Sequence, residues 1–303
     1  MSDMNITVEG GTSVRLKTAG KYCDRDILVT VTGGGSESST NNLDSFLSGT
    51  LPILESNAET IKDYGCYSHS DLTDVLLPEV TKIGAKAFYG CSNLVNLSTP
   101  KLTELGNDAF DFCEKLIKVD IPAMTNYGYS AFENCTALSE VNAPLITSIP
   151  ANGFRYCSSL ETINVPNITK INQYAFAACE SLKHVDFAKV SSISNGAFSV
   201  CSALEEANFP LVKSIPTSCF ATCSNLKYAV LPKCTSIAGS AFNGCTSLEY
   251  IDFSGCTSVP SLGNVSAFTN IPETCEFRVP ESLYDTWIAA TNWTTYASYI
   301  VAV

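Results

Sequence analysis

The sequence predicts an α/β solenoid in which coils of 22 residues, each with a strand and a short helix, stack on one another. Three columns of residues at fixed spacing support this prediction. The first column is a phenylalanine every 22 residues: Phe88, Phe110, Phe132, Phe154, Phe176, Phe198, Phe220 and Phe242. A cysteine follows each phenylalanine by three residues, from Cys91 to Cys245, and a leucine follows each cysteine by three, from Leu94 to Leu248. Eight repeats in one register define the repeating unit.

Each repeat contains two hydrophobic periodicities. In the repeat that begins at Leu160, alternate apolar residues end at Pro166, which predicts a short strand closed by a residue without an N–H donor. The segment from Ile171 to Cys179 spaces its apolar residues like one face of a helix, which predicts a helix of about two turns. Glycine or proline, as at Gly84, marks the turn into this helix.

A single coil cannot be stable alone, because its apolar side chains bury too little surface to offset the entropy of ordering the backbone. Stacked coils bury both of their faces and complete a parallel strand ladder, so stability accumulates through contacts between neighbours. The repeat therefore predicts one continuous array.

Four segments are expected along the chain. Residues 1–32 form a small β module, with strands near 6–8, 14–17 and 27–31, and residues 33–42 (GGGSESSTNN) form a flexible linker. The solenoid spans 43–273, with clean repeats over about 72–259, and the register has slipped by Phe268. Residues 274–303 form a C-terminal cap, with a final strand at 276–279 and a helix carrying Leu283, Trp287 and Ala290.

The repeat L-P-x-Φ-T-x-I-G-x-x-A-F-x-x-C-x-x-L, where Φ is apolar, resembles the BspA-like class of bacterial leucine-rich repeats over roughly residues 50–265. The resemblance implies a curved, right-handed leucine-rich-repeat solenoid. Members of that class often lie on bacterial surfaces, where they act as adhesins toward host proteins or other cells. The segment after Val279 is similar to a tail common after such arrays, and the first strands are similar to leading segments of phage- and prophage-associated proteins.

Composition excludes several classes of partner. The 303 residues are 45% hydrophobic and only 16% charged, and 18 basic against 30 acidic residues give a net charge of −12. Nucleic acid and anionic membranes are not expected partners, because phosphate contacts need clustered Lys and Arg. No apolar run reaches the ~18–20 residues of a membrane span.

The first residues show neither the basic nor the apolar part of a secretory signal, and no LPxTG-type wall anchor occurs. We therefore expect synthesis in the cytoplasm, with a virion and a non-classical surface location as the two alternatives. The oligomeric state is left open.

Fourteen cysteines raise the question of disulfides or metal. Eight form the ladder, and Cys66, Cys219, Cys234 and Cys256 also fall on core positions, which leaves Cys23 and Cys275. Parallel side chains one rung (~4.8 Å) apart fit disulfide geometry poorly. Zinc is disfavoured because the chain has no C-x-x-C pair and only two histidines. The sequence predicts buried free thiols and a reducing compartment of synthesis.

No catalytic arrangement is apparent. His69 occupies a cysteine slot and is expected to pack in the core, whereas His184 lies on the outward strand face without a cysteine beside it. The chain has no nucleophile elbow, phosphate-binding loop or dinucleotide-binding motif. We expect no enzyme activity, no cofactor and no catalytic metal.

Positions two and four residues after each leucine point away from the core, because side chains alternate across a strand. The candidate partner-binding face consists of Asp120, Glu140, Asn142, Asn164, His184, Asp186, Glu206, Asn208, Tyr228, Val230, Tyr250 and Asp252. It is rich in carboxylates and amides, with an aromatic patch near its C-terminal end. The alternatives are a face selected only for solubility and a row of oxygen ligands for Ca²⁺.

Two functions fit these observations. The first is a non-enzymatic binding or adhesion protein that presents the concave strand face of the solenoid to a protein or glycan partner, with residues 1–32 as an attachment module. The second is a structural spacer or assembly subunit of a phage tail or other complex, which has no ligand of its own.

Overall fold

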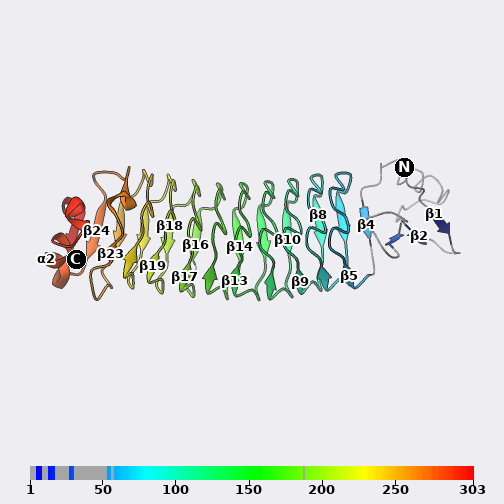
Figure 1. Cartoon of the computed structure of the whole chain (residues 1–303), viewed down its shortest axis with the longest axis horizontal. Coiled ribbons are helices and arrows are strands. Elements are labelled where there is room, and N and C mark those ends of the chain that lie inside the picture. The colour runs from blue at the N-terminus through cyan, green and yellow to red at the C-terminus, as the bar shows by residue number, and fades with distance from the viewer. Residues whose placement is uncertain (1–4, 9–12, 18–26, 31–52, 56–57, 187) are drawn as a thin grey trace. The chain divides into compact units, whose positions relative to one another are not determined.

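The computed structural model describes the backbone of residues 5–8, 13–17, 27–30, 53–55, 58–186 and 188–303, and the side chains of 58–184 and 188–303. The chain divides into two compact units, residues 1–145 and residues 146–303, and both contain the same stacked coil (Figure 1). The linker predicted at 33–42, the predicted start of the solenoid at residue 43 and Cys23 lie outside the described residues.

The first unit opens with an antiparallel sheet of β1 (Asn5–Val8), β2 (Ser13–Lys17) and β3 (Ile27–Thr30). These strands agree with the expected ones to within one residue at each end. That they form an independent module stays a prediction.

The coils of the first unit build two sets of parallel strands. The longer strands are β4 (Ile53–Glu55), β6 (Asp74–Leu76), β8 (Asn96–Ser98), β10 (Lys118–Asp120) and β12 (Glu140–Asn142), in which β4, β6 and β8 pair in one sheet and β10 pairs with β12 in another. The other set contains the two-residue strands β5 (Thr60–Ile61), β7 (Lys82–Ile83), β9 (Glu104–Leu105) and β11 (Asn126–Tyr127). The sequence analysis had anticipated only the longer strand of each coil.

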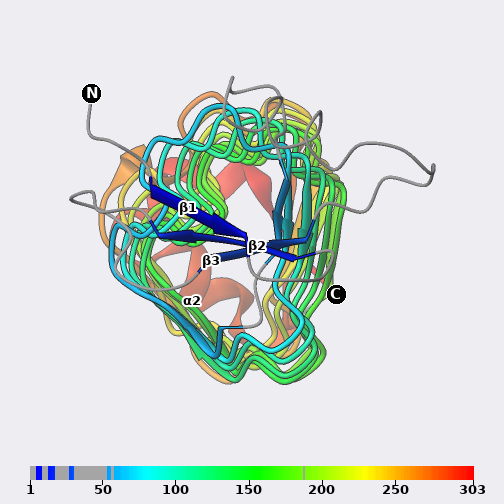
Figure 2. The same ribbon diagram turned by 90° about the vertical axis from the view of Figure 1, so that its right-hand side faces the viewer.

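The second unit repeats this arrangement. Its longer strands are β14 (Thr162–Asn164), β16 (His184–Asp186), β18 (Glu206–Asn208), β20 (Tyr228–Val230) and β22 (Tyr250–Asp252). Its short strands are β13 (Ser148–Ile149), β15 (Lys170–Ile171), β17 (Ser192–Ile193), β19 (Ser214–Ile215), β21 (Ser236–Ile237) and β23 (Ser261–Leu262). Within each unit, successive coils overlie one another when viewed along the stack (Figure 2). The predicted solenoid fold is therefore confirmed.

The predicted core columns lie inside the coils. Phenylalanine rings of neighbouring coils stack face to face, with centroids 5.0 Å apart for Phe88 and Phe110 and 5.4 Å apart for Phe176 and Phe198. Such offset stacking adds to the free energy gained from burying the rings. Every ring of the column is fully buried.

The ladder cysteines add a second repeated contact. Ladder thiols donate to backbone carbonyls of the preceding coil, as Cys201 Sγ does to the carbonyl oxygen of Phe176 at 3.0 Å. Burial raises the pKa of the Cys201 thiol to about 12. The thirteen described cysteines are free and buried, including Cys275, which the sequence analysis had left outside the core.

The prediction of a short helix in each repeat is wrong, because the segment around each phenylalanine is a run of turns. The N–H groups of Lys86, Phe88 and Gly90 donate to carbonyl oxygens of the next coil at 2.8–2.9 Å, so they cannot close helical bonds along their own coil. Lys86 and Gly90 also have φ values of 54° and 71°, which are left-handed and end any helix. Alternate N–H groups therefore bond to the next coil, and those between them close turns within their own coil, as the N–H of Cys91 does with the carbonyl oxygen of Phe88.

The cap contains β24 (Glu276–Val279), the 3-10 helix η2 (Glu281–Leu283), α2 (Tyr284–Ile288), the 3-10 helix η3 (Trp293–Tyr299) and β25 (Ile300–Ala302). The strand predicted to be final, β24, is followed by β25, which pairs with it in parallel. Trp287 and Trp293 are fully buried, and Trp293 Nε1 donates to the carbonyl oxygen of Pro260 at 2.7 Å. These large side chains cover the apolar end of the coil stack.

The register slip before the cap does not end the phenylalanine column. Phe268 lies in the 3-10 helix η1 (Val265–Phe268), and its ring stacks on Phe242 with centroids 5.6 Å apart. The extra residues of this coil are therefore accommodated outside the core.

Candidate interaction surface on the strand face

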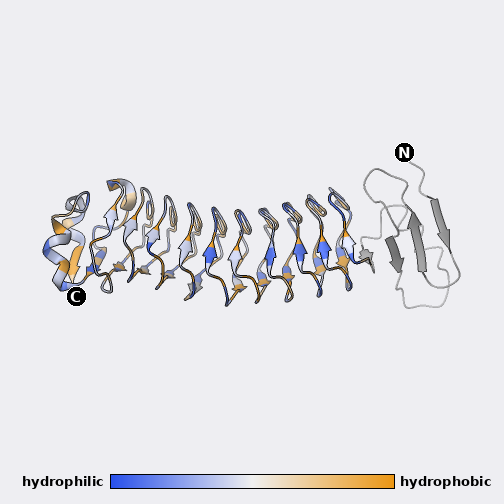
Figure 3. Cartoon of the chain, turned by 60° about the horizontal axis from the view of Figure 1, so that its bottom comes forward, coloured by the Kyte–Doolittle hydropathy of each residue, from blue (hydrophilic) through white to orange (hydrophobic). Residues whose placement is uncertain are grey.

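The longer strands set the direction of the candidate residues. Most of their middle residues, such as Val119 in the first unit and Ala229 in the second, are fully buried, and those of β8 and β14 are half-buried, whereas the flanking residues point outward. Figure 3 shows the hydrophilic residues that recur on these strands. Parallel pairing places equivalent residues of neighbouring coils side by side.

In the first unit, the outward residues pair with one another. Asn142 Nδ2 donates to Asp120 Oδ1 at 2.8 Å, and Lys118 Nζ lies 2.7 Å from Glu140 Oε1. Opposite charges and amide–carboxylate pairs therefore satisfy one another across β10 and β12. This part of the face has the polar, internally paired character of an ordinary solvated sheet.

In the second unit, the predicted residues lie on five consecutive strands. Asn164 is exposed on β14, and His184 and Asn208 are exposed on β16 and β18. The backbone of Asp186 pairs with that of Asn208, and the side chain of Asp186 lies outside the described residues. The half-buried outward residues are Glu206, Tyr228, Val230, Tyr250 and Asp252.

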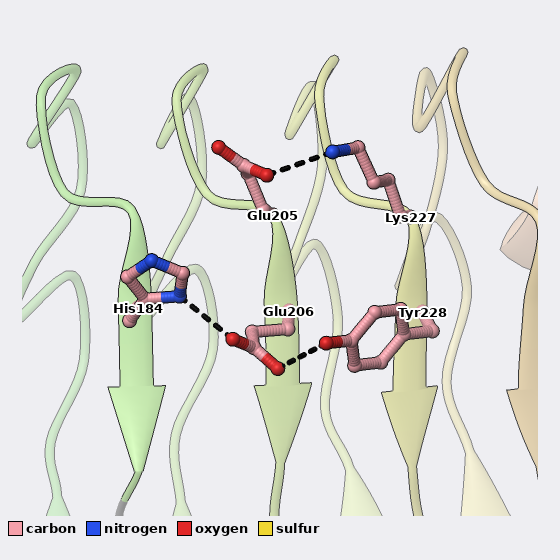
Figure 4. Close-up of polar contacts among 5 residues, drawn as sticks. All are labelled: His184, Glu205, Glu206, Lys227 and Tyr228. Atoms are coloured by element: carbon pink, nitrogen blue, oxygen red, sulfur yellow. Dashed lines mark hydrogen bonds and ion pairs between the residues drawn. The ribbon is translucent and has the colours of Figure 1, made fainter.

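Three of these side chains form a connected chain of polar contacts across β16, β18 and β20 (Figure 4). His184 Nδ1 lies 2.7 Å from Glu206 Oε1, and the Tyr228 hydroxyl donates to Glu206 Oε2. The neighbouring residues Glu205 and Lys227 form a parallel ion pair at 2.8 Å. The Glu206 carboxylate thus links an imidazole on one side to a phenol on the other.

The contact chain continues into an aromatic stack. The rings of Tyr228 and Tyr250 are nearly parallel, with centroids 5.3 Å apart. The guanidinium carbon of Arg278, on β24, lies 3.7 Å from the centroid of the Tyr250 ring. Arg278 Nε also donates to Glu276 Oε2 at 2.9 Å, which holds the guanidinium in place. We call His184, Glu206, Tyr228, Tyr250 and Arg278 the recognition row.

The hydrogen bond between Tyr228 and Glu206 determines the protonation of these two side chains. It lowers the pKa of the Glu206 carboxyl and raises the pKa of Tyr228 to about 12. Glu206 is therefore ionised and Tyr228 is neutral near pH 7. The row presents a carboxylate, two phenol rings and a guanidinium in a fixed order along one line.

Arg278 and Glu276 were missed by the sequence analysis, which assigned their segment to the cap alone. The register could have found them, because β24 pairs with β22 so that Glu276 lies opposite Tyr250 and Arg278 opposite Asp252. The cap strand therefore extends the candidate surface by one rung.

The prediction that His69 packs in the core is wrong. Its side chain is 52% exposed, and its Nδ1 lies 3.9 Å from Asp71 Oδ1. Burying a polar imidazole without a partner is unfavourable, so the ring turns outward although its backbone occupies a cysteine slot.

Among the residues that the structure describes, no group of three or more His, Cys, Asp and Glu side chains has the arrangement of a metal site. Within the same residues, no helix is both long and apolar enough to cross a membrane.

Comparisons with known proteins were made for sequence and for structure. The family model of the BspA type leucine rich repeat region matches residues 59–182 and 147–273, with six copies. No curated protein matches the chain.

Solved structures of bacterial leucine-rich repeat proteins are similar to the chain. One from Bacteroides ovatus has a TM-score of 0.64 at 18% identity, and the match covers 100% of this chain and 81% of that protein. A leucine-rich repeat protein of T. pallidum has a TM-score of 0.47 at 26% identity, covering 50% of this chain and 76% of that one. The first of these similarities supports the solenoid fold.

Proposed function

We propose that this chain, which belongs to the BspA-type leucine-rich repeat family, is a non-enzymatic binding protein that contacts a protein or glycan partner through the strand face of residues 146–303. The observation that carries this proposal is the recognition row. Stacked solenoid coils commonly serve as extended binding surfaces, because neighbouring strands display side chains along a line.

The composition of the recognition row favours recognition over solubility alone. Tyrosine and arginine are the residue types that most often dominate binding energy at interfaces. Tyr228, Tyr250 and Arg278 lie in contact and are held by Glu206 and Glu276, so little side-chain entropy is lost when a partner binds. The face of the first unit, where Lys118 pairs with Glu140, is also internally paired but consists of polar and charged groups without such an aromatic stack.

The row also limits the chemistry of the partner. Phenol rings offer flat apolar area to aliphatic or aromatic side chains and to the apolar faces of sugars, while Glu206 and Arg278 offer directional polar contacts at either end. Protein and glycan ligands both combine apolar patches with hydrogen-bonding groups. Both remain candidate partners, and the experiment below distinguishes them.

The test is a comparison of matched variants on a glycan array and against surface proteins of candidate partner cells. Tyr250→Ala and Arg278→Ala should weaken binding at least about tenfold, the effect of removing an anchor residue. Lys118→Ala in the first unit is the control and should leave binding unchanged. Binding that survives both recognition-row variants would reject this face, and no binding to any probe would favour the structural spacer.

We further propose that the chain acts either on the cell surface or in a virion, with residues 1–32 as its attachment module. Fractionation separates the two locations. Protein on intact, non-lysed cells supports an adhesin, whereas protein in purified virions supports a role in assembly. Recovery only in the soluble fraction of lysed cells would contradict both.

A further inference from the structure

A second group of exposed side chains lies on the turn segments of the first unit. Four aromatic rings follow one another over three coils: Tyr64, Tyr67, Tyr89 and Phe112, here called the turn row. Successive ring centroids are 5.6, 5.1 and 5.5 Å apart. Tyr64, Tyr67 and Phe112 remain 47%, 39% and 38% exposed. The rings therefore form a continuous aromatic strip in contact with solvent, on turn segments rather than on the strand face.

The backbone at two of these rings is in the left-handed conformation. Phe112 has a φ of 59°, and the equivalent positions of the neighbouring coils hold Ser68, Gly90 and Asn134 with φ values of 56°, 71° and 57°. Glycine and asparagine adopt this left-handed conformation easily, whereas a bulky phenylalanine is strained in it. Tyr64 shows the same conflict, with a φ of 58°. Tyr156 and Val200 are exposed at the same left-handed position in the second unit, so strain alone assigns no role to Phe112. What distinguishes Phe112 is that its ring continues the row of contacts formed by Tyr64, Tyr67 and Tyr89.

Carboxylates surround the end of the turn row. Asp111 precedes Phe112 and is almost fully buried, with its Oδ1 accepting a hydrogen bond from Asn134 Nδ2 at 2.9 Å. Burial raises the pKa of Asp111 to about 6, with Glu133 and Asp108 adding like-charge repulsion. Burial also raises the pKa of Asp108. A positive charge placed here would offset both the burial of these carboxyl groups and their mutual repulsion.

The rings already hold one cation from the chain itself. Lys86 Nζ lies 5.4 Å from the centroid of the Tyr89 ring, within the range of a cation–π contact. Burial raises the pKa of Tyr89, and the nearby Asp111 carboxylate raises it further. The Asp111 carboxylate therefore acts on the Tyr89 ring, and Lys86 partly offsets it.

We propose that the turn row is a second interaction surface, which docks a segment of a partner protein with apolar side chains next to lysine or arginine. The exposed rings supply the apolar contact, and Asp108, Asp111 and Glu133 supply the charge complementarity. An acidic segment would be repelled by the same carboxylates. This surface is independent of the recognition row, which lies in the second unit.

The test uses a substitution for which a structural and a binding role give opposite results. Phe112→Asn places a residue that tolerates the left-handed conformation at this position and keeps the net charge. We expect the midpoint of urea unfolding to be unchanged or raised, while binding is lost. Val200→Asn is the matched control, because Val200 in the second unit is also strained and 40% exposed, with a φ of 64°. It should match the stability result and leave binding intact.

The probe is a short synthetic peptide in which lysine alternates with leucine, and a peptide with glutamate in place of lysine is its counterpart. Binding is measured by calorimetry near physiological ionic strength. We expect the lysine peptide to bind and the glutamate peptide not to bind, with Phe112→Asn and Tyr67→Ser each weakening the affinity at least about tenfold. Tyr250→Ala in the recognition row should leave this affinity unchanged. No binding of the lysine peptide, equal binding of both peptides, unchanged affinity in Phe112→Asn, or a lowered unfolding midpoint in that variant would each overturn the proposal.

Discussion

In the coils of residues 146–303, equivalent core positions hold the same residue, whereas equivalent outward positions hold different residues. Phenylalanine recurs at every rung from Phe154 to Phe242, and each ring stacks on its neighbours. The first outward position of the strands, in contrast, holds four residue types on five rungs: Thr162, His184, Glu206, Tyr228 and Tyr250. A buried side chain must fit the same space in every coil because the backbone repeats, whereas an outward side chain meets solvent and can differ from coil to coil. The outward residues can therefore vary to suit contacts with a partner without disturbing the core.

The largest effect should come from opening the inner column. Phe154→Ala removes a fully buried ring that stacks on Phe176, and the free energy of unfolding should fall by ~3–5 kcal/mol. Asn164→Ala, on the outward face of the same coil, should change it by less than ~0.5 kcal/mol. Urea unfolding of both variants measures the difference. If both were equally tolerated, the division between inside and outside would be wrong.

Asp111 is an exception to this division, because it is a carboxyl group buried beside the turn row. Its pKa rises from 3.8 to about 6 on folding, so the folded protein binds this proton more tightly than the unfolded chain does. The contribution of Asp111 to stability should therefore become less favourable as pH rises from about 4 to above 6. Asp111→Asn should remove this dependence and raise the free energy of unfolding at pH 7 by roughly 1–3 kcal/mol.

The measurement is urea unfolding across that pH range, with the wild-type chain and Asp111→Asn compared at each pH. A variant that is less stable than the wild-type chain at pH 7 would show that the Asp111 carboxylate is stabilised rather than strained in the fold.

The smallest effect on stability, with a clear spectroscopic signal, is expected at the recognition row. Glu206→Gln removes the carboxylate that accepts from the Tyr228 hydroxyl, so the pKa of Tyr228 should fall from about 12 toward 10.0. Ultraviolet titration of tyrosine ionisation follows this change. Glu205→Gln, whose carboxylate pairs with Lys227, is the control and should shift Tyr228 far less. Identical titrations of the two variants would contradict the contact between Glu206 and Tyr228.

The sequence allowed the fold to be predicted because the core columns obey one rule at every rung. The spacing of Phe88, Cys91 and Leu94 identified the coil, its buried face and its family, and the structure and the family match confirm all three. The turn segments were misassigned because their apolar spacing also fits a helix. Hydrogen bonds to the next coil decide between the two, and a single repeat carries no information about its neighbours.

The candidate surface was only partly predictable. Alternation along the strands placed Glu206, Tyr228 and Tyr250 outward, but no local pattern shows that they touch one another. Arg278 joins them from the cap, where the repeat motif has disappeared and only the pairing of β22 with β24 reveals the register. The turn row was not recognised because its rings fall at three different positions of the repeat, so that only Tyr67 and Tyr89 share a column in the sequence.

The central claim is that the inner columns form a dry stack and leave only the outer faces for partners. Thiol accessibility tests it most directly, because the cysteines form one of these columns and burial raises the pKa of Cys201 to about 12. We predict that the thirteen described cysteines resist alkylation in the folded protein. After denaturation without reductant, nearly all of the fourteen thiols should react. Rapid labelling of ladder cysteines in the folded state, or only a few free thiols after denaturation, would contradict the account.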